Sequence, residues 1–138
     1  MNVPQLAPAL TTVRLTLHVL AAAVWVGGQF TVAGLLPALR QLGEGAPRKV
    51  AQAFGKLQWP AYVLLLITGV WNVTAVHVNK AHGTWKVVLF IKIGVVLVAG
   101  LAAYIHQNSK SKVGLAVGGA VASLSSVAAL VLGVLLTG

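Results

Sequence analysis

Four long apolar stretches fill most of this 138-residue chain, and they limit the folds that it can adopt. They run over about residues 13–39, 54–78, 85–105 and 113–136. A helix rises about 1.5 Å per residue and needs about 20 apolar residues to cross about 30 Å of hydrocarbon, so each stretch is long enough. Only 8% of the residues are charged, against about 25% in a soluble domain. The sequence therefore predicts an integral membrane protein.

The pattern inside the stretches predicts helices. Membrane strands alternate apolar and polar residues over about ten positions, and none of the four stretches does so. The connections between the stretches are short, which favours antiparallel neighbours. We therefore expect an all-α, up-down-up-down four-helix bundle that forms a single domain over residues 1–138.

The basic residues predict the orientation of the bundle. The net charge is +9 and Glu44 is the only acidic residue. The connections after the first and third stretches carry six basic residues: Arg40, Arg48, Lys49, Lys56, Lys110 and Lys112. The other side carries three: Arg14, Lys80 and Lys86. The positive-inside rule then places both termini outside the membrane, with lipid as the partner of the excess charge. The basic residues do not interleave with aromatic ones, so no nucleic acid partner is expected.

Two ionisable residues lie well inside the apolar stretches, His18 in the first and Lys92 in the third. Counted from the start of each stretch, they lie about 8 Å and about 10 Å deep on the same side. His77 and His82 fall near that side too, whereas His106 falls at the other end. Ionisable groups at such depth are costly and usually mark a site. We expect His18 and Lys92 to share a cavity beneath the outer surface; the alternatives are a packing histidine and a lysine that extends to the interface.

Helical spacing adds polar residues to this cavity. His18, Trp25 and Gln29 fall on one stripe of the first helix, so all three are expected to face the interior. Asn72 is the polar residue of the second stretch expected near the site. In the fourth stretch small residues recur at every fourth position, namely Gly114, Gly118, Ala122 and Ser126. This ridge favours close helix packing, either within the bundle or in a homodimer.

Several short runs carry a family resemblance. The run LHVLAAAVWVGG from Leu17 to Gly28, Leu36-Pro37, Thr68-Gly69, and Thr84-Trp85 followed by Lys92 resemble the four-helix membrane domain of the copper-resistance protein D (CopD) family. The same skeleton is more distantly similar to the HemJ-type protoporphyrinogen oxidases. The resemblance covers about residues 13–108. In both families His18 and Lys92 match the functional positions.

The CopD resemblance implies copper binding, transport or resistance, without enzyme activity, and a periplasmic protein that delivers the metal. The ligands would be imidazoles, His18 with His77 or His82. The chain has no cysteine and one methionine, so it lacks the soft ligands that Cu(I) prefers. This first interpretation is preferred because residues 21–28 are closest to the CopD pattern.

The HemJ resemblance implies heme b instead. His18 would be the axial ligand, Lys92 would pair with a propionate or act on the tetrapyrrole, and the protein would be a heme-dependent oxidoreductase if it is an enzyme. The small residues expected to line a flat slot are Ala21, Ala22, Gly28, Gly94 and Ala99. A third interpretation, a structural subunit of a larger membrane complex, rests on the small-residue ridge of the fourth stretch.

Overall fold

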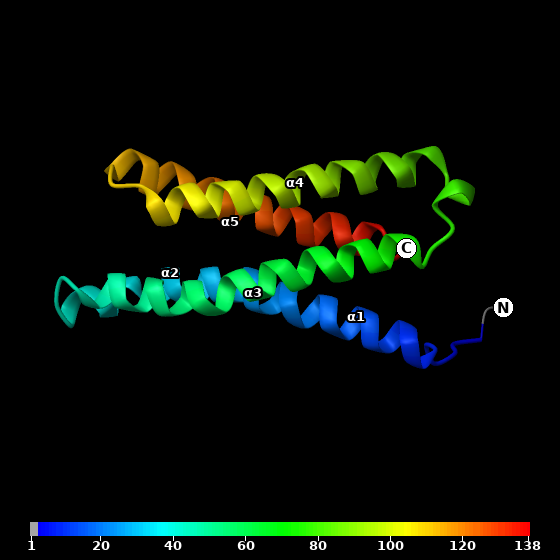
Figure 1. The fold of residues 1–138 in the computed structure, drawn as a ribbon, viewed down its shortest axis with the longest axis horizontal. Coiled ribbons are helices and arrows are strands. Elements are labelled where there is room, and N and C mark those ends of the chain that lie inside the picture. The colour runs from blue at the N-terminus through cyan, green and yellow to red at the C-terminus, as the bar shows by residue number, and fades with distance from the viewer. Residues whose placement is uncertain (1–2) are drawn as a thin grey trace.

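A computed structural model describes residues 3–138, which form an all-α bundle (Figure 1). Three segments follow one another without a break: α1 (Ala9–Ala22), the π-helix η1 (Ala23–Gly27) and α2 (Gly28–Gln41). The rest of the chain forms α3 (Ala46–Thr74), the short 3-10 helix η2 (Val78–Lys80), α4 (Gly83–Asn108) and α5 (Lys112–Leu135). Four helices, with Ala9–Gln41 counted as one, are long and apolar enough to cross a membrane. The predicted fold class is therefore confirmed.

The second helix differs from its predicted range of 54–78. It begins at Ala46, with Pro47 in its first turn, and it ends at Thr74. An apolar stretch marks the part of a helix that crosses hydrocarbon, and the polar turns beyond it can be helical in the headgroup region. The early end has a consequence for the site, because His77 lies outside α3 and directly before η2.

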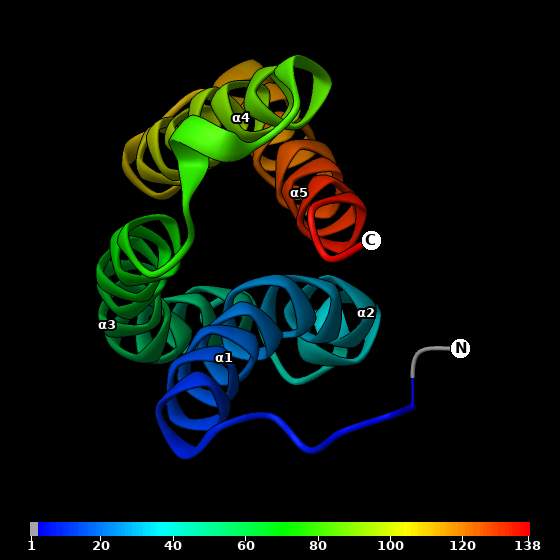
Figure 2. The ribbon, with the colours of Figure 1, turned by 90° about the vertical axis from the view of Figure 1, so that its right-hand side faces the viewer.

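The bundle consists of two helical hairpins. α1 and α2 pack on α3, and α4 packs on α5. Figure 2 shows the two hairpins as separate pairs, with α4 and α5 above α1 and α2. The start of α1, the C-terminus and the 75–82 connection lie at one end, which we call the termini end (Figure 1). The other two connections lie at the opposite end.

A single tryptophan lies where the two hairpins meet. Trp25 of η1 is only 3% exposed and packs in one cluster with small residues of α4 and α5, namely Ala99, Ala102, Ala103 and Ala122. Its ring lies 5.9 Å from that of Trp59 and 4.6 Å from that of Tyr62, measured between centroids. Small residues let helices approach closely in lipid, so the large indole fills the remaining space.

Hydrogen bonds join the hairpins in the middle of the bundle and towards the opposite end. Trp25 Nε1 donates to Ser126 Oγ at 2.9 Å, and the Tyr62 hydroxyl donates to the Val96 carbonyl at 2.9 Å. Deeper towards the opposite end, Trp59 Nε1 donates to Gln107 Oε1 at 2.8 Å. Within residues 3–138, no side-chain hydrogen bond joins the hairpins nearer the termini end than these.

The small-residue ridge of α5 packs inside the chain. Gly118, Ala122 and Ser126 are buried, and a Cβ on Gly118 would lie 3.0 Å from the backbone nitrogen of His106. The His106 ring bonds the Leu115 carbonyl through Nδ1 at 2.7 Å. The ridge therefore packs within the bundle, with Gly118 against α4 and Ser126 bonded to Trp25 of η1. His106 has a structural role in the contact between α4 and α5.

Candidate functional site

The hydrogen bonds of Thr68 determine the state of the His18 ring. The hydroxyl of Thr68, a residue that is 1% exposed, donates its single proton to the Leu64 carbonyl at 2.7 Å. The same oxygen lies 2.7 Å from His18 Nδ1. When the hydroxyl proton lies on the Leu64 side, the hydroxyl accepts from His18 Nδ1–H. In that tautomer the lone pair of Nε2 is free to bind a ligand.

Lys92 lies across the bundle from His18, on α4 of the other hairpin. The Lys92 amine packs against the backbone of Gly133 on α5, where a Cβ would lie 2.9 Å from Nζ. Helical side chains lean towards the N-terminus of their own helix, which for α4 is the termini end. Gly133 thus leaves the space that the amine occupies.

His18, Thr68, Lys92 and Gly133 come from four different helices and meet at one level, which we call the His18 layer. The Trp25–Ser126 hydrogen bond sets the register of the first helix against α5. Seven residues separate His18 from Trp25, and seven separate Ser126 from Gly133 along an antiparallel helix. His18 and Gly133 are therefore level, and the Lys92 amine touches Gly133. The shared cavity of imidazole and amine stays a prediction.

Trp25 and Gln29, which share the predicted stripe with His18, lie deeper in the bundle. Both bond the same hydroxyl of α5: Trp25 Nε1 donates to Ser126 Oγ at 2.9 Å and Gln29 Nε2 at 3.3 Å. They belong to the contact between the two hairpins around Trp25 and Ser126, which we call the junction. His18, in contrast, bonds Thr68 of its own hairpin. The π-helix begins at Ala23, after His18, and contains Trp25, so the helical phase changes between His18 and Gln29. π-bulges of this kind are frequent at functional sites. Nothing in the residue types of 23–27 predicts it.

One turn nearer the termini end lies a second pair of polar residues, Arg14 and Asn72. Arg14 precedes His18 by four residues, and Asn72 follows Thr68 by four on an antiparallel helix, so the two are level. Among the residues that the structure describes, Arg14 Nε and Asn72 Oδ1 are both buried without a hydrogen-bond partner. Asn72 was predicted near the site and lies next to the His18 layer. From the sequence, Arg14 is predicted only as one of the basic residues that orient the bundle. Its four-residue spacing from His18 indicates that the two side chains share one face of the helix.

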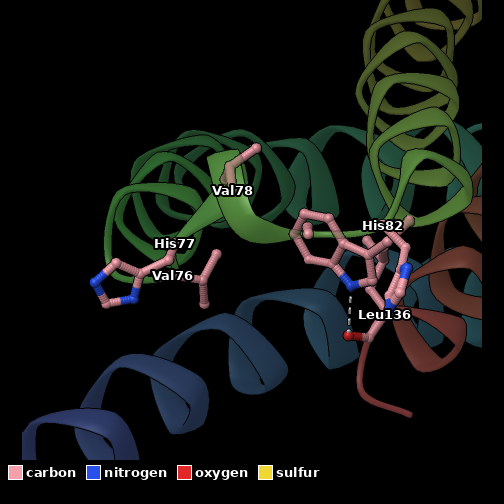
Figure 3. A pocket seen from close by; sticks show the side chains of 7 residues that line it. Val76, His77, Val78, His82 and Leu136 are labelled. Atoms are coloured by element: carbon pink, nitrogen blue, oxygen red, sulfur yellow. Dashed lines mark hydrogen bonds between the residues drawn. The ribbon is translucent and has the colours of Figure 1, made fainter.

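His77 and His82 do not converge on His18. They line a shallow pocket of about 310 Å³ in the 75–82 connection, with Trp85 and Leu136 among the other residues. In Figure 3 the His77 ring points away from His82, which lies beside Leu136. His77 is exposed because α3 ends at Thr74. Over residues 3–138, no group of three or more His, Cys, Asp or Glu residues could hold a metal ion.

The small residues expected to line one slot are dispersed. Ala99 packs with Trp25 in the junction, and the Phe54 ring occupies the space in front of Gly28. Gly94 is exposed, and nothing lies within 4 Å of the position of its Cβ. Ala21, which is buried, and Ala22, which is half-buried, follow His18 by three and four residues on α1 and lie near the His18 layer. A ligand at His18 would therefore be bordered by Thr68, Lys92 and Gly133.

No protein-family model, curated protein or solved structure matches the chain.

Proposed function

We propose that this chain is a heme b-binding membrane protein, with the heme between the two hairpins and His18 Nε2 as its axial ligand. The hydrogen bond between His18 Nδ1 and the Thr68 hydroxyl carries the proposal, because it occupies Nδ1 and leaves Nε2 as the ring nitrogen for a ligand. Ligating histidines usually donate their other ring N–H to a fixed acceptor, which sets the tautomer and the ring orientation.

The donor set around His18 fits heme better than a bare metal ion. Heme carries four of its own nitrogen ligands and needs one imidazole, whereas copper held by the protein alone needs several ligands. The nearest cation, Lys92, fits the acidic edge of a tetrapyrrole. A ligand between the hairpins at this level breaks no hydrogen bond between them, since those bonds lie deeper.

Bound heme supplies one-electron redox chemistry, and the residues of this chain hold and orient it. Thr68 fixes the His18 ring, and Lys92 supplies a positive charge across the bundle. Glu44, the only acidic side chain, lies in the connection between α2 and α3 at the opposite end. Any proton transfer at the His18 layer would therefore depend on imidazole or amine groups. An enzyme built on this site would be a heme-dependent oxidoreductase.

Copper handling of the CopD type is the competing proposal, and it rests on the resemblance of Leu17–Gly28 to that family. His18 would then be one ligand, and a periplasmic protein would deliver the metal. His77 and His82 would have to move towards His18 to complete the coordination sphere. The same resemblance and the basic connections support a bacterial inner membrane with both termini outside. A homodimer or a larger complex would have to use faces of α5 other than its buried ridge.

The absorption spectrum of the purified protein tests heme against copper. We expect an intense Soret band and about one heme per chain after expression with a heme supply, because one histidine is poised as the axial ligand. The same sample is assayed for copper by elemental analysis. Stoichiometric copper with no Soret band would contradict heme binding and support the competing proposal.

A methyl group at Gly133 is expected to disturb the site without unfolding the helix. Gly133→Ala places a Cβ against the Lys92 amine, which must move away from the His18 layer. We expect heme affinity to fall about tenfold, the size of one charge-assisted hydrogen bond. Heme titration in detergent measures the effect. The matched control is Gly34→Ala, because no atom lies within 4 Å of that Cβ position; equal affinities for the two variants would contradict a role for the amine at Gly133.

A further inference from the structure

The termini end of the bundle concentrates positive charge with no acidic partner. Arg14 and Lys92 come from different hairpins and lie within about one helical turn of His18. Glu44, the only acidic side chain, is at the opposite end of the bundle. Charged groups removed from water are stable only when they are paired. An anion from outside the protein side chains would pair with these charges.

We propose that Arg14 and Lys92 bind the carboxylate groups of a tetrapyrrole, whose acidic edge then faces the termini end. The inference rests on the proposed function, since it assigns the orientation of the ligand at the same site. Arg14 is the residue that this inference adds to the site. Its Nε–H is buried without a partner, and a guanidinium binds a carboxylate through two parallel hydrogen bonds, one of which uses Nε–H.

The position of Arg14 agrees with the dimensions of such a ligand. Arg14 lies one turn, about 5.4 Å, closer to the termini end than His18. An iron bound at His18 would be at the centre of the macrocycle, and the carboxylate groups would lie at its rim. The Lys92 side chain leans towards the same end of the bundle, on the other hairpin. The two cations can thus bind one edge of a flat ligand from both sides.

A direct hydrogen bond between Arg14 and Asn72 is the alternative. The two are level, and their buried atoms without partners are a donor, Nε–H, and an acceptor, Oδ1. A small rotation of either side chain could join them, and Arg14 would then have only a structural role. This alternative predicts that Arg14 contributes nothing to the recognition of carboxylates.

Binding of iron-free porphyrins separates the two interpretations and does not depend on axial ligation. We compare protoporphyrin IX with its dimethyl ester, which lacks the acidic groups, by fluorescence titration of the full chain in neutral detergent. The parent is expected to bind the free acid about tenfold more tightly than the ester. Arg14→Gln should remove this preference and Arg14→Lys should restore most of it, while His77→Ala, at an exposed residue of a separate pocket, should leave it in place. Circular dichroism verifies that each variant is folded.

The outcomes distinguish this inference from the proposed function. Equal binding of acid and ester by the parent, or an unchanged preference in Arg14→Gln, overturns the carboxylate assignment, even if heme still binds through His18. A preference that depends on Arg14, in a protein that shows no Soret band with heme, supports the carboxylate site and overturns axial ligation by His18. Failure to bind heme and both porphyrins overturns the two proposals together.

Discussion

Replacement of His18 by alanine is expected to abolish the Soret band, with heme affinity reduced at least about a hundredfold. The physical reason is that Nε2 of His18 is the one nitrogen at this level with a free lone pair, since Nδ1–H is engaged by Thr68. Loss of the axial ligand leaves only contacts with the edge and faces of the macrocycle. Heme titration followed by absorption, with the redox spectrum as a second readout, measures the change.

The matched controls are the histidines of the 75–82 connection. His77→Ala and His82→Ala remove imidazoles that are exposed and lie in a separate shallow pocket. Both variants should bind heme like the parent. If His82→Ala lost the Soret band and His18→Ala kept it, the ligand would bind in that pocket and the assignment to His18 would be wrong.

Thr68 provides a finer test of the same geometry. Thr68→Val keeps the shape of the side chain but removes the acceptor for His18 Nδ1–H, so the ring loses its fixed tautomer and orientation. Loss of such a supporting hydrogen bond typically reduces affinity by about 10- to 100-fold. Thr68→Ser retains the hydroxyl and should bind nearly as well as the parent. Equal binding by the Val and Ser variants would contradict the role given to Thr68.

The fold was predictable because lipid restricts the choice of structure so strongly. Each apolar stretch must form a helix that satisfies its own backbone, and short connections make neighbours antiparallel. The ends of α3 were not predictable in the same way. Hydropathy reports where hydrocarbon begins and ends, whereas the helix over Ala46–Thr74 extends into polar turns at one end and stops early at the other.

The depth of the site in the membrane was predictable from the sequence, but the residues that contact His18 were not. His18 and Lys92 were identified because ionisable residues in an apolar stretch are costly. The contact of His18 with Thr68 depends on the register of α1 against α3, and the sequence of each helix alone does not contain that register. The π-helix at Ala23–Gly27 depends on how Trp25 packs between α3 and α5, which is again a property of the assembled bundle.

Replacement of Trp25 by alanine is expected to have the largest effect on stability. The side chain is 3% exposed and stacks with Trp59 and Tyr62, and it also bonds Ser126. Truncation of a buried Trp in a soluble protein lowers the free energy of unfolding by about 3–5 kcal/mol. Lipid gives no hydrophobic driving force between helices, so the loss here comes from packing and the hydrogen bond. We expect about 3 kcal/mol, measured by SDS-induced unfolding in mixed micelles.

Two further variants divide this loss between packing and hydrogen bonding. Trp25→Phe keeps an aromatic ring but cannot donate to Ser126 Oγ, and it should lower stability by about 1 kcal/mol in addition to any small packing loss. Ser126→Ala removes the acceptor and should have a similar effect, and the two changes together should be less than additive because they break the same bond. The matched control is Trp71→Ala, at an indole that is 36% exposed and forms no side-chain hydrogen bond. If Trp25→Ala were no more destabilising than Trp71→Ala, the two hairpins would not be held together at Trp25, and the register that places His18 beside Gly133 would lose its support.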